Sequence, residues 1–323
     1  MFLVSSYITN QNSLKYRHYM PSSDPTHVTA VNDKVEYQYQ FHTDKLGFRT
    51  TYQCTNQAST GRFISIHGDS FTEGQGVAKP WTVAFQKSIC SKGFQSINMA
   101  MPGNGISDFR GTINLSKSLF PKAPKVLAAI DHDFFREPYH VKADPICSRY
   151  FVSIPEENNC LTAKVKWSHV TDLAEVPEQL KIAKSRKEYG LMPFAQFVAR
   201  TVKSYLDQRF AFSYSLNSPI YKKSISALEE YLKNDPSTVL LIRLPMQNYI
   251  LNKDTTITHS FNLANIAQSF PNTFYLDLAK SCSLSPNDFF ENDPHPNQLG
   301  HDKLSRCLLR SDEYHQFINT VSP

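Results

Sequence analysis

The chain has 323 residues, of which 41% are hydrophobic and 20% are charged; these proportions are ordinary for a globular protein with one large domain or two modest ones. The net charge is only +5, with 34 basic and 29 acidic residues interspersed, which argues against a nucleic-acid partner because such surfaces need a basic stripe. No run of about eighteen apolar residues occurs, so no membrane-spanning helix is expected.

Residues 1–60 are predicted to form an N-terminal arm and a β-hairpin. Residues 1–34 are polar without a clear period and are interpreted as an extended arm. The first residues lack the basic segment and long apolar run of a signal peptide. A truncated or processed start would leave an extracytoplasmic location open. Apolar and polar residues then alternate over 35–41, which predicts a strand, with a turn around 43–47 before the pattern resumes at Phe48.

Five short apolar runs separated by helical patterns predict a parallel sheet. The runs are RFISIH, FQSINM, PKVLAAID, TVLLIRL and TFYLDL, which begin at residues 62, 94, 124, 238 and 273. Strands that alternate with helices form a parallel sheet covered by helices on both faces. Residues 61–323 are therefore predicted to fold as an α/β domain, a three-layer α/β/α sandwich around a five-stranded parallel sheet.

Roughly a hundred residues, about 134–236, separate the third and fourth predicted strands. This is far more than a crossover connection needs, and its helical patterns predict a partly helical insertion. Insertions beside the carboxyl ends of strands often shape a binding cleft. The alternative is a solvated elaboration without a role in the site.

The cysteines carry no recognisable metal or redox pattern. They lie at positions 54, 90, 147, 160, 282 and 307, and none forms a CxxC pair. Scattered cysteines in a chain of this size are expected to be buried reduced thiols, with three disulfides as the alternative. Asp131, His132 and Asp133 are consecutive, so their side chains should diverge, and neither a metal nor another cofactor is expected.

The first candidate for catalysis is Ser70, which follows the first predicted strand in the sequence Gly-Asp-Ser. Ligands of open parallel sheets bind outside the carboxyl ends of the strands. A serine at that point can attack through Oγ while its backbone N–H helps to bind an oxyanion, provided that a base activates it. The alternative is that Ser70 only caps the N-terminus of a helix.

The base is expected in the proline-rich loop that precedes the last long helix. Asp293 and His295 lie two residues apart there, and a carboxylate at this spacing can fix the tautomer of the imidazole and leave its other nitrogen for a serine. The alternative is that both are turn residues. The following helix is predicted over about 297–310, and its inward-facing side chains are expected to be Leu299, Leu304 and Leu308.

These segments together resemble the SGNH (GDSL-type) hydrolase superfamily, from about Arg62 to the C-terminus except for the insertion. GDSFTEGQGV, followed by Trp81, resembles the first block of the family, which implies that Ser70 is the nucleophile. NMAMPGNG resembles the second block and implies that Gly103 and Ser70 contribute N–H groups to an oxyanion hole. DPHPNQLGH resembles the last block and implies that Asp293 orients His295 as the general base.

The resemblance also implies a flavodoxin-like sheet and points to a subgroup. The segment TDKLGFR is similar to one that precedes the GDS strand in a bacterial subgroup whose catalytic pair has the pattern D-x-H. The third block departs from the family pattern, Gly-x-Asn-Asp, in which the asparagine completes the oxyanion hole. This chain has AAIDHDFF, so His132 is expected to supply the donor, with Asn104, or a hole of two donors, as the alternatives.

Three functions are compatible with these residues. The first is a serine esterase or deacylase that removes an acyl group, expected to be acetyl, from a carbohydrate or related small molecule. The second is an O-acyltransferase that uses the same three residues to pass the acyl group to a sugar hydroxyl. The third is a catalytically impaired binding protein on the same fold, because a fold alone does not determine function.

Overall fold

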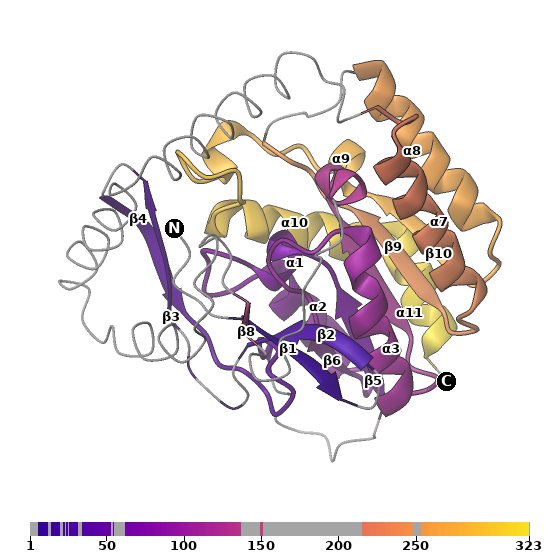
Figure 1. The fold of residues 1–323 in the computed structure, drawn as a ribbon, viewed down its shortest axis with the longest axis horizontal. Helices are drawn as coiled ribbons and strands as arrows, with labels where there is room; N and C mark the ends of the chain where they lie inside the picture. The colour runs from indigo at the N-terminus through magenta and orange to yellow at the C-terminus, as the bar shows by residue number, and fades with distance from the viewer. Residues whose placement is uncertain are drawn as a thin grey trace, which may run out of the picture.

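A five-stranded parallel sheet forms the centre of the protein (Figure 1). The computed structural model describes residues 6–11, 14–19, 22, 24, 26–31, 34–52, 54, 62–136, 149–150, 215–247 and 253–322. The strands of the sheet are β5 (Phe63–His67), β6 (Gln95–Asn98), β7 (Lys125–Ala129), β9 (Val239–Arg243) and β10 (Thr273–Asp277). Their order is β10-β9-β7-β5-β6, and each neighbouring pair is parallel.

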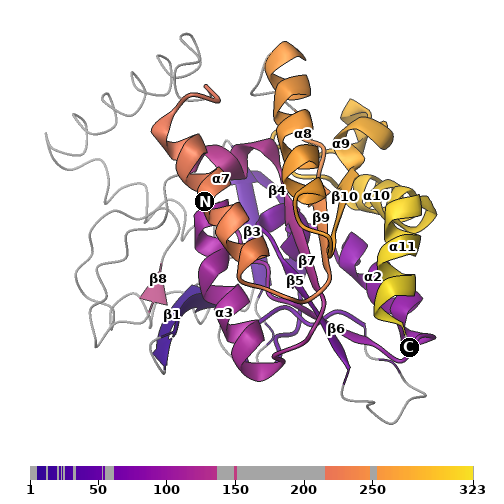
Figure 2. The same ribbon diagram turned by 90° about the vertical axis from the view of Figure 1, so that its right-hand side faces the viewer.

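Helices pack on both faces of this sheet (Figure 2). One face carries α3 (Phe109–Leu119), α7 (Pro219–Lys233) and α8 (Lys253–Gln268), and the other carries α2 (Trp81–Cys90), α10 (Gln298–Arg310) and α11 (Asp312–Val321). Along β7, Val126 and Ala128 pack in the apolar cluster under the second group of helices, whereas Leu127 and Ala129 pack under the first. The predicted three-layer α/β/α sandwich is confirmed, and its strand order is that of the flavodoxin-like doubly wound folds.

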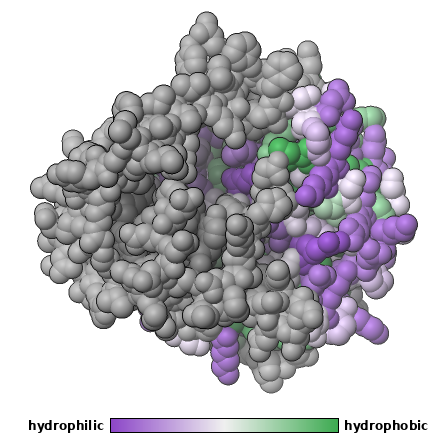
Figure 3. All heavy atoms as spheres, in the orientation of Figure 1, coloured by the Kyte–Doolittle hydropathy of each residue, from purple (hydrophilic) through white to green (hydrophobic). Residues whose placement is uncertain are grey.

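The connections between the strands contain short helical segments. The short segments are α1 (Ser70–Glu73), α9 (Leu278–Ser281) and the 3₁₀ turns Ile106–Asp108, Asp131–Phe135 and Pro286–Asp288. The described surface on the right-hand side of Figure 3 is mostly hydrophilic. In the described ranges, no helix has the length and apolar character needed to cross a membrane.

One detail of the predicted last helix is wrong. Leu304 and Leu308 are fully buried, but Leu299 is 60% exposed. Since each helical residue turns the chain by about 100°, a position five residues before Leu304 lies well off the buried stripe. The helix itself begins and ends within one residue of its predicted limits.

The N-terminal segment contains more strand than predicted. β1 (Ser6–Gln11) pairs with β2 (Leu14–His18) and β8 (Arg149–Tyr150), and β3 (Thr26–Val31) pairs with β4 (Lys34–Gln40). The expectation of an extended arm over residues 1–34 is therefore wrong at these positions. Strand β3 was not predicted because its buried residues include polar ones, His27 and Thr29. The predicted turn around residues 43–47 is present, and Thr43 forms a β-bridge with Arg49. Strand β4, however, pairs with the strand that precedes it, β3.

The connection between β7 and β9 is described only at its ends. The turn Asp131–Phe135 begins it, and α7 completes it on the way to β9. Residues 137–148 and 151–214 of the predicted insertion lie outside the described residues. The division at about residue 60 and the limits of the insertion therefore stay predictions.

The expectation of reduced cysteines is wrong for four of the six. Disulfides join Cys54 to Cys90 and Cys282 to Cys307, and the described part of the chain has no free cysteine. The partners are 36 and 25 residues apart, so only the tertiary fold brings them together. The two other cysteines lie outside the described residues.

Candidate active site

Ser70 lies just beyond the carboxyl end of β5, as the first residue of α1. The chain packs too closely at Gly68 for a side chain, since a Cβ on it would lie 2.4 Å from Oγ1 of Thr72 and 2.7 Å from the carbonyl oxygen of Ala128. Asp69 is the N-cap, and its Oδ1 accepts the backbone N–H of Phe71 at 2.9 Å. The capping alternative for Ser70 is therefore wrong, because the neighbouring aspartate has that role.

The fold brings Ser70, His295 and Asp293 into one chain of contacts. Nε2 of His295 lies 2.7 Å from Oγ of Ser70, and Nδ1 of the same ring is hydrogen-bonded to Oδ1 of Asp293. The backbone N–H of His295 donates to that same Oδ1 at 2.9 Å. All three residues are buried. The loop before α10 and the turn after β5 thus meet at the carboxyl edge of the sheet, where the sequence places both.

The direction of the protons in this chain follows from the chemistry of the groups. An ionised carboxylate only accepts hydrogen bonds, so Nδ1 of His295 carries the proton that faces Asp293. Nε2 is then left to accept the O–H of Ser70. Burial raises the pKa of Asp293, but hydrogen bonds from His295 and Tyr37 outweigh it and hold this pKa below its usual value. The carboxyl group is therefore ionised at neutral pH.

Tyr37 of β4 completes the surroundings of Asp293, and sequence reasoning missed it. Its hydroxyl donates to Oδ2 of Asp293 at 3.0 Å and accepts from Nε2 of Gln75 at 2.8 Å. The only signal was the alternation over residues 35–41, which marks Tyr37 as facing one side of a strand. The alternation does not indicate which distant residue that side contacts.

A second tyrosine of β4 fixes the far end of α1. The hydroxyl of Tyr39 donates to Oε2 of the fully buried Glu73 at 3.2 Å, and Nη1 of Arg49 lies 3.5 Å from Oε1. Arg49 also donates to the carbonyl oxygens of Gly74 at 2.7 Å and Val77 at 2.6 Å. Arg49 belongs to the segment TDKLGFR, so that segment holds the helix on which Ser70 lies.

The candidate oxyanion donors follow three neighbouring strands. Ser70 follows β5, Gly103 and Asn104 follow β6, and His132 follows β7. Gly103 has a φ of 77°, in the left-handed region that favours glycine. Among the residues that the structure describes, the N–H groups of Ser70 and Gly103 donate to no backbone carbonyl. Burial and nearby Arg136 lower the pKa of His132 to about 4, so its imidazole is neutral at pH 7.

Arg136 connects these three loops, and sequence reasoning did not single it out. Its Nη1 donates to the carbonyl oxygen of Asn104 at 3.1 Å and lies 3.2 Å from Oδ1 of Asp133 and 3.5 Å from Oδ2 of Asp69. Its Nη2 lies 3.5 Å from Nδ1 of His132. Burial and repulsion from Asp69 raise the pKa of Asp133 well above its usual value. One guanidinium thus faces two buried carboxyl groups beside the candidate nucleophile.

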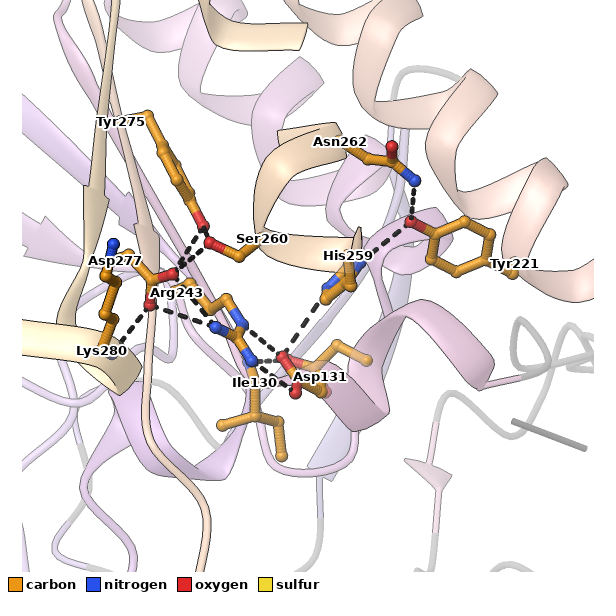
Figure 4. A network of polar contacts seen from close by, with 11 residues as sticks. Ile130, Asp131, Tyr221, Arg243, His259, Ser260, Asn262, Tyr275, Asp277 and Lys280 are labelled. Carbon is orange, nitrogen blue, oxygen red and sulfur yellow. Dashed lines mark hydrogen bonds and ion pairs between the residues drawn. The ribbon is translucent and has the colours of Figure 1, made fainter. Parts of the chain in front are cut away.

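The turn that carries His132 is anchored on its other side by a buried ion-pair network (Figure 4). Nε and Nη2 of Arg243, at the end of β9, donate to the two carboxylate oxygens of Asp131 at 2.6 and 2.8 Å. Nη1 donates to both oxygens of Asp277 at 3.2 and 3.1 Å, and Nε2 of His259 lies 3.6 Å from Asp131. Asp131 therefore pairs with Arg243, whereas His132 contacts Arg136.

Comparison with known proteins finds likeness in solved structures alone. No protein-family model and no curated protein matches the chain. TesA has 12% sequence identity at a TM-score of 0.43, over 77% of this chain and 96% of TesA. An acetylxylan esterase from Geobacillus stearothermophilus has 12% identity at 0.43, over 78% and 94% of the two chains. An α/β hydrolase, LAE5, from the metagenome of Lake Arreo has 11% identity at 0.42, over 80% and 97%.

Proposed function

We propose that the protein is a serine esterase of the SGNH type, from the bacterial subgroup with a D-x-H pair. Ser70 is the nucleophile, His295 the general base and Asp293 the residue that orients it. The observation that carries this proposal is the contact chain itself, in which Oγ of Ser70 lies 2.7 Å from Nε2 of His295 and the opposite ring nitrogen bonds Asp293. A serine is a weak nucleophile until such a base accepts its proton.

The reaction proceeds through an acyl-enzyme. Oγ of Ser70 attacks the ester carbonyl carbon as its proton passes to Nε2 of His295, and the resulting imidazolium protonates the leaving alcohol oxygen. A water molecule then gives its proton to His295 and attacks the acyl carbon, after which the imidazolium returns the proton to Ser70. Asp293 stays ionised throughout and stabilises the imidazolium, in line with its lowered pKa.

The oxyanion that forms in each half-reaction is bound by the N–H groups of Ser70 and Gly103 and by the ring of His132. A guanidinium can only donate hydrogen bonds, so Arg136 beside Nδ1 of His132 favours the neutral tautomer with its proton on Nε2. That N–H replaces the amide of the family's asparagine. The side chain of Asn104 is the alternative donor, and removing the wrong candidate will leave turnover intact.

The substrate is expected to be an acyl ester, acetyl above all, of a carbohydrate or related small molecule. The two disulfides are typical of proteins in oxidising compartments, and such a location would suit an extracellular or cell-surface substrate. The third candidate, an impaired binding protein, does not account for the complete contact chain from Ser70 to Asp293.

One observation favours a second enzymatic function, O-acyl transfer to a sugar hydroxyl. Ser70 is only 4% exposed and His295 only 8%, and a transferase has to keep water away from its acyl-enzyme. Both enzymes use the same first half-reaction. They differ in whether water or a sugar hydroxyl accepts the acyl group.

Labelling by a fluorophosphonate, combined with hydrolysis of p-nitrophenyl acetate, tests the proposal. We expect the wild type to be labelled and to release p-nitrophenol, and Ser70→Ala to do neither. Ser305→Ala is the control, because Ser305 is a partly buried serine on α10 whose hydroxyl donates to the carbonyl oxygen of His301 within the same helix. Release accelerated by added sugar acceptors, with an acylated sugar as product, would favour the transferase. Equal labelling of wild type and Ser70→Ala would overturn both.

A further inference from the structure

We propose that Tyr37 of the N-terminal hairpin is a positioning residue of the active site, which holds the carboxylate of Asp293 ionised and oriented toward His295. This inference rests on the proposed function. It makes the hairpin β3–β4 a part of the active site, although the hairpin precedes the five-stranded parallel sheet in the chain.

The hydroxyl of Tyr37 has Gln75, Thr29 and Asp293 as hydrogen-bond partners, and the ionised carboxylate of Asp293 can only accept. The amide Nε2 of Gln75 can only donate, so the tyrosine oxygen accepts that bond, of 2.8 Å. The single proton of the phenol is then directed to Oδ2 of Asp293 at 3.0 Å. The resulting series runs from Gln75 through Tyr37 to the carboxylate, which also receives Nδ1–H of His295.

The two oxygens of Asp293 divide the donors between them. Oδ1 receives the ring and backbone N–H groups of His295, and Oδ2 receives the hydroxyl of Tyr37. A carboxylate bonded at both oxygens cannot rotate about its Cβ–Cγ bond without losing a hydrogen bond. Without the phenol, a buried oxygen would lose a strong charge-assisted donor, and the neutral acid would gain in population.

The ring of Tyr37 is held by the same loop that carries His295. Tyr37 is buried and stacks on Phe290 with ring centroids 4.1 Å apart, and the N–H of Phe290 donates to the carbonyl oxygen of His295 at 3.1 Å. Gly76 packs so closely that a Cβ there would lie 2.5 Å from the Phe290 ring and 3.1 Å from that of Tyr37. The phenol therefore approaches Asp293 from a fixed position.

Tyr37 keeps its proton at every working pH. Burial and the negative charge of Asp293 raise its pKa above the ordinary value for tyrosine. It consequently acts as a neutral donor and takes no proton from the reaction, which is why its role is positioning.

Tyr314 of α11 offers a matched control outside the site. Tyr37 and Tyr314 are 7% and 5% exposed. The hydroxyl of Tyr314 is hydrogen-bonded to Oγ of Ser88 on α2. Phenylalanine at either position removes one buried hydroxyl and retains the ring.

The test compares full-length wild type, Tyr37→Phe, Tyr314→Phe, Asp293→Ala and the double variant Tyr37→Phe/Asp293→Ala in hydrolysis of p-nitrophenyl acetate. A hydrogen bond to a charged group corresponds to a loss of kcat of about 10- to 100-fold in Tyr37→Phe, with KM changed less than about twofold. Tyr314→Phe should keep a kcat near that of the wild type. In the Asp293→Ala background, Tyr37→Phe should cause no further loss, because the group through which it acts is gone.

A second readout does not depend on turnover. The proton shared by His295 and Asp293 should give a low-field ¹H NMR resonance, which Tyr37→Phe shifts and Tyr314→Phe does not. Wild-type kcat and an unmoved resonance in Tyr37→Phe would overturn the inference, as would fully additive losses in the double variant. An inactive, unlabelled wild type would overturn the proposed function, whereas a resonance that still shifts in Tyr37→Phe would support the positioning contact by itself.

Discussion

The hydroxyl oxygen of Ser70 lies 2.7 Å from Nε2 of His295, although 225 residues separate them in the chain. Two local features produce this contact. The first is the turn after β5, capped by Asp69. The second is the loop before α10, whose N-cap Asn297 accepts the N–H groups of Leu299 and Gly300. Because both lie at the carboxyl edge of one parallel sheet, the fold brings them together.

Asp293→Asn should lower kcat far more than it lowers stability. An amide nitrogen at this position would donate to Nδ1 of His295 and favour the tautomer with its proton on Nε2, which cannot accept the proton of Ser70. By analogy with other serine hydrolases, the expected loss of kcat is about 10³- to 10⁴-fold. Steady-state kinetics with p-nitrophenyl acetate measure it, and a loss smaller than tenfold would contradict the assigned role of Asp293.

His132→Ala should identify the third oxyanion donor. Loss of one such donor lowers kcat by about 10²- to 10³-fold with little change in KM. Asn104→Ala is the matched comparison, because Asn104 contacts Arg136 through its backbone carbonyl, which this substitution retains. A large loss in Asn104→Ala with an unchanged His132→Ala would reassign the donor to Asn104.

The stability of Asp133→Asn relative to that of the wild type should increase as the pH rises. Burial and repulsion from Asp69 raise the pKa of Asp133 in the folded state. Folding therefore favours the protonated carboxyl, whose contribution is complete below the unfolded pKa of about 3.9 and is lost as the pH rises toward the folded value. Asparagine stays neutral and can still accept the N–H of Ile130, which Oδ2 of Asp133 now accepts at 3.1 Å.

Melting temperatures of both proteins between about pH 4 and pH 8 measure this difference. We expect the melting temperature of Asp133→Asn, relative to the wild type, to rise steadily over that range. A difference that is constant, or that decreases with pH, would show that Asp133 is ionised in the folded protein across the range.

Replacement of Cys282 and Cys307 by serine should lower stability and leave the active site intact. The disulfide closes a loop of 25 residues, and a cross-link of this kind stabilises a fold by about 3 kcal/mol. Denaturant unfolding of the double variant measures the loss, and kcat in buffer without denaturant should stay near the wild-type value. A variant of unchanged stability would mean that the cross-link does not form in solution.

The sheet and the three central site residues could be predicted because their signals are local. Each strand lies in a short run that contains several apolar residues. Ser70 follows the first of these strands, and Asp293 and His295 lie in the loop before α10. The strand β3 could not be predicted in this way, since its buried residues include His27 and Thr29. An alternation of polar and apolar residues is not visible where the buried face is itself polar.

The supporting residues of the site could not be predicted because each acts across a long sequence separation. Tyr37 contacts Asp293 256 residues away, and the alternation along β4 marks only the face on which its side chain lies. In the sequence, nothing distinguishes Arg136 from other basic residues that follow a strand. Only the fold places its guanidinium near both Asp69 and Asp133. The two disulfides could not be predicted for the same reason, since the spacing of cysteines in the sequence does not show which distant pairs are joined.

The central claim is that acyl transfer passes through Ser70, and trapping the acyl-enzyme tests it most directly. Wild type, Ser70→Ala and His295→Ala would be mixed with p-nitrophenyl acetate, quenched in acid within the first turnover and analysed by peptide mass mapping. We expect an acetyl group on the peptide that contains Ser70 in the wild type, and none in either variant. An acetyl group on another residue, or hydrolysis that survives in Ser70→Ala, would contradict it.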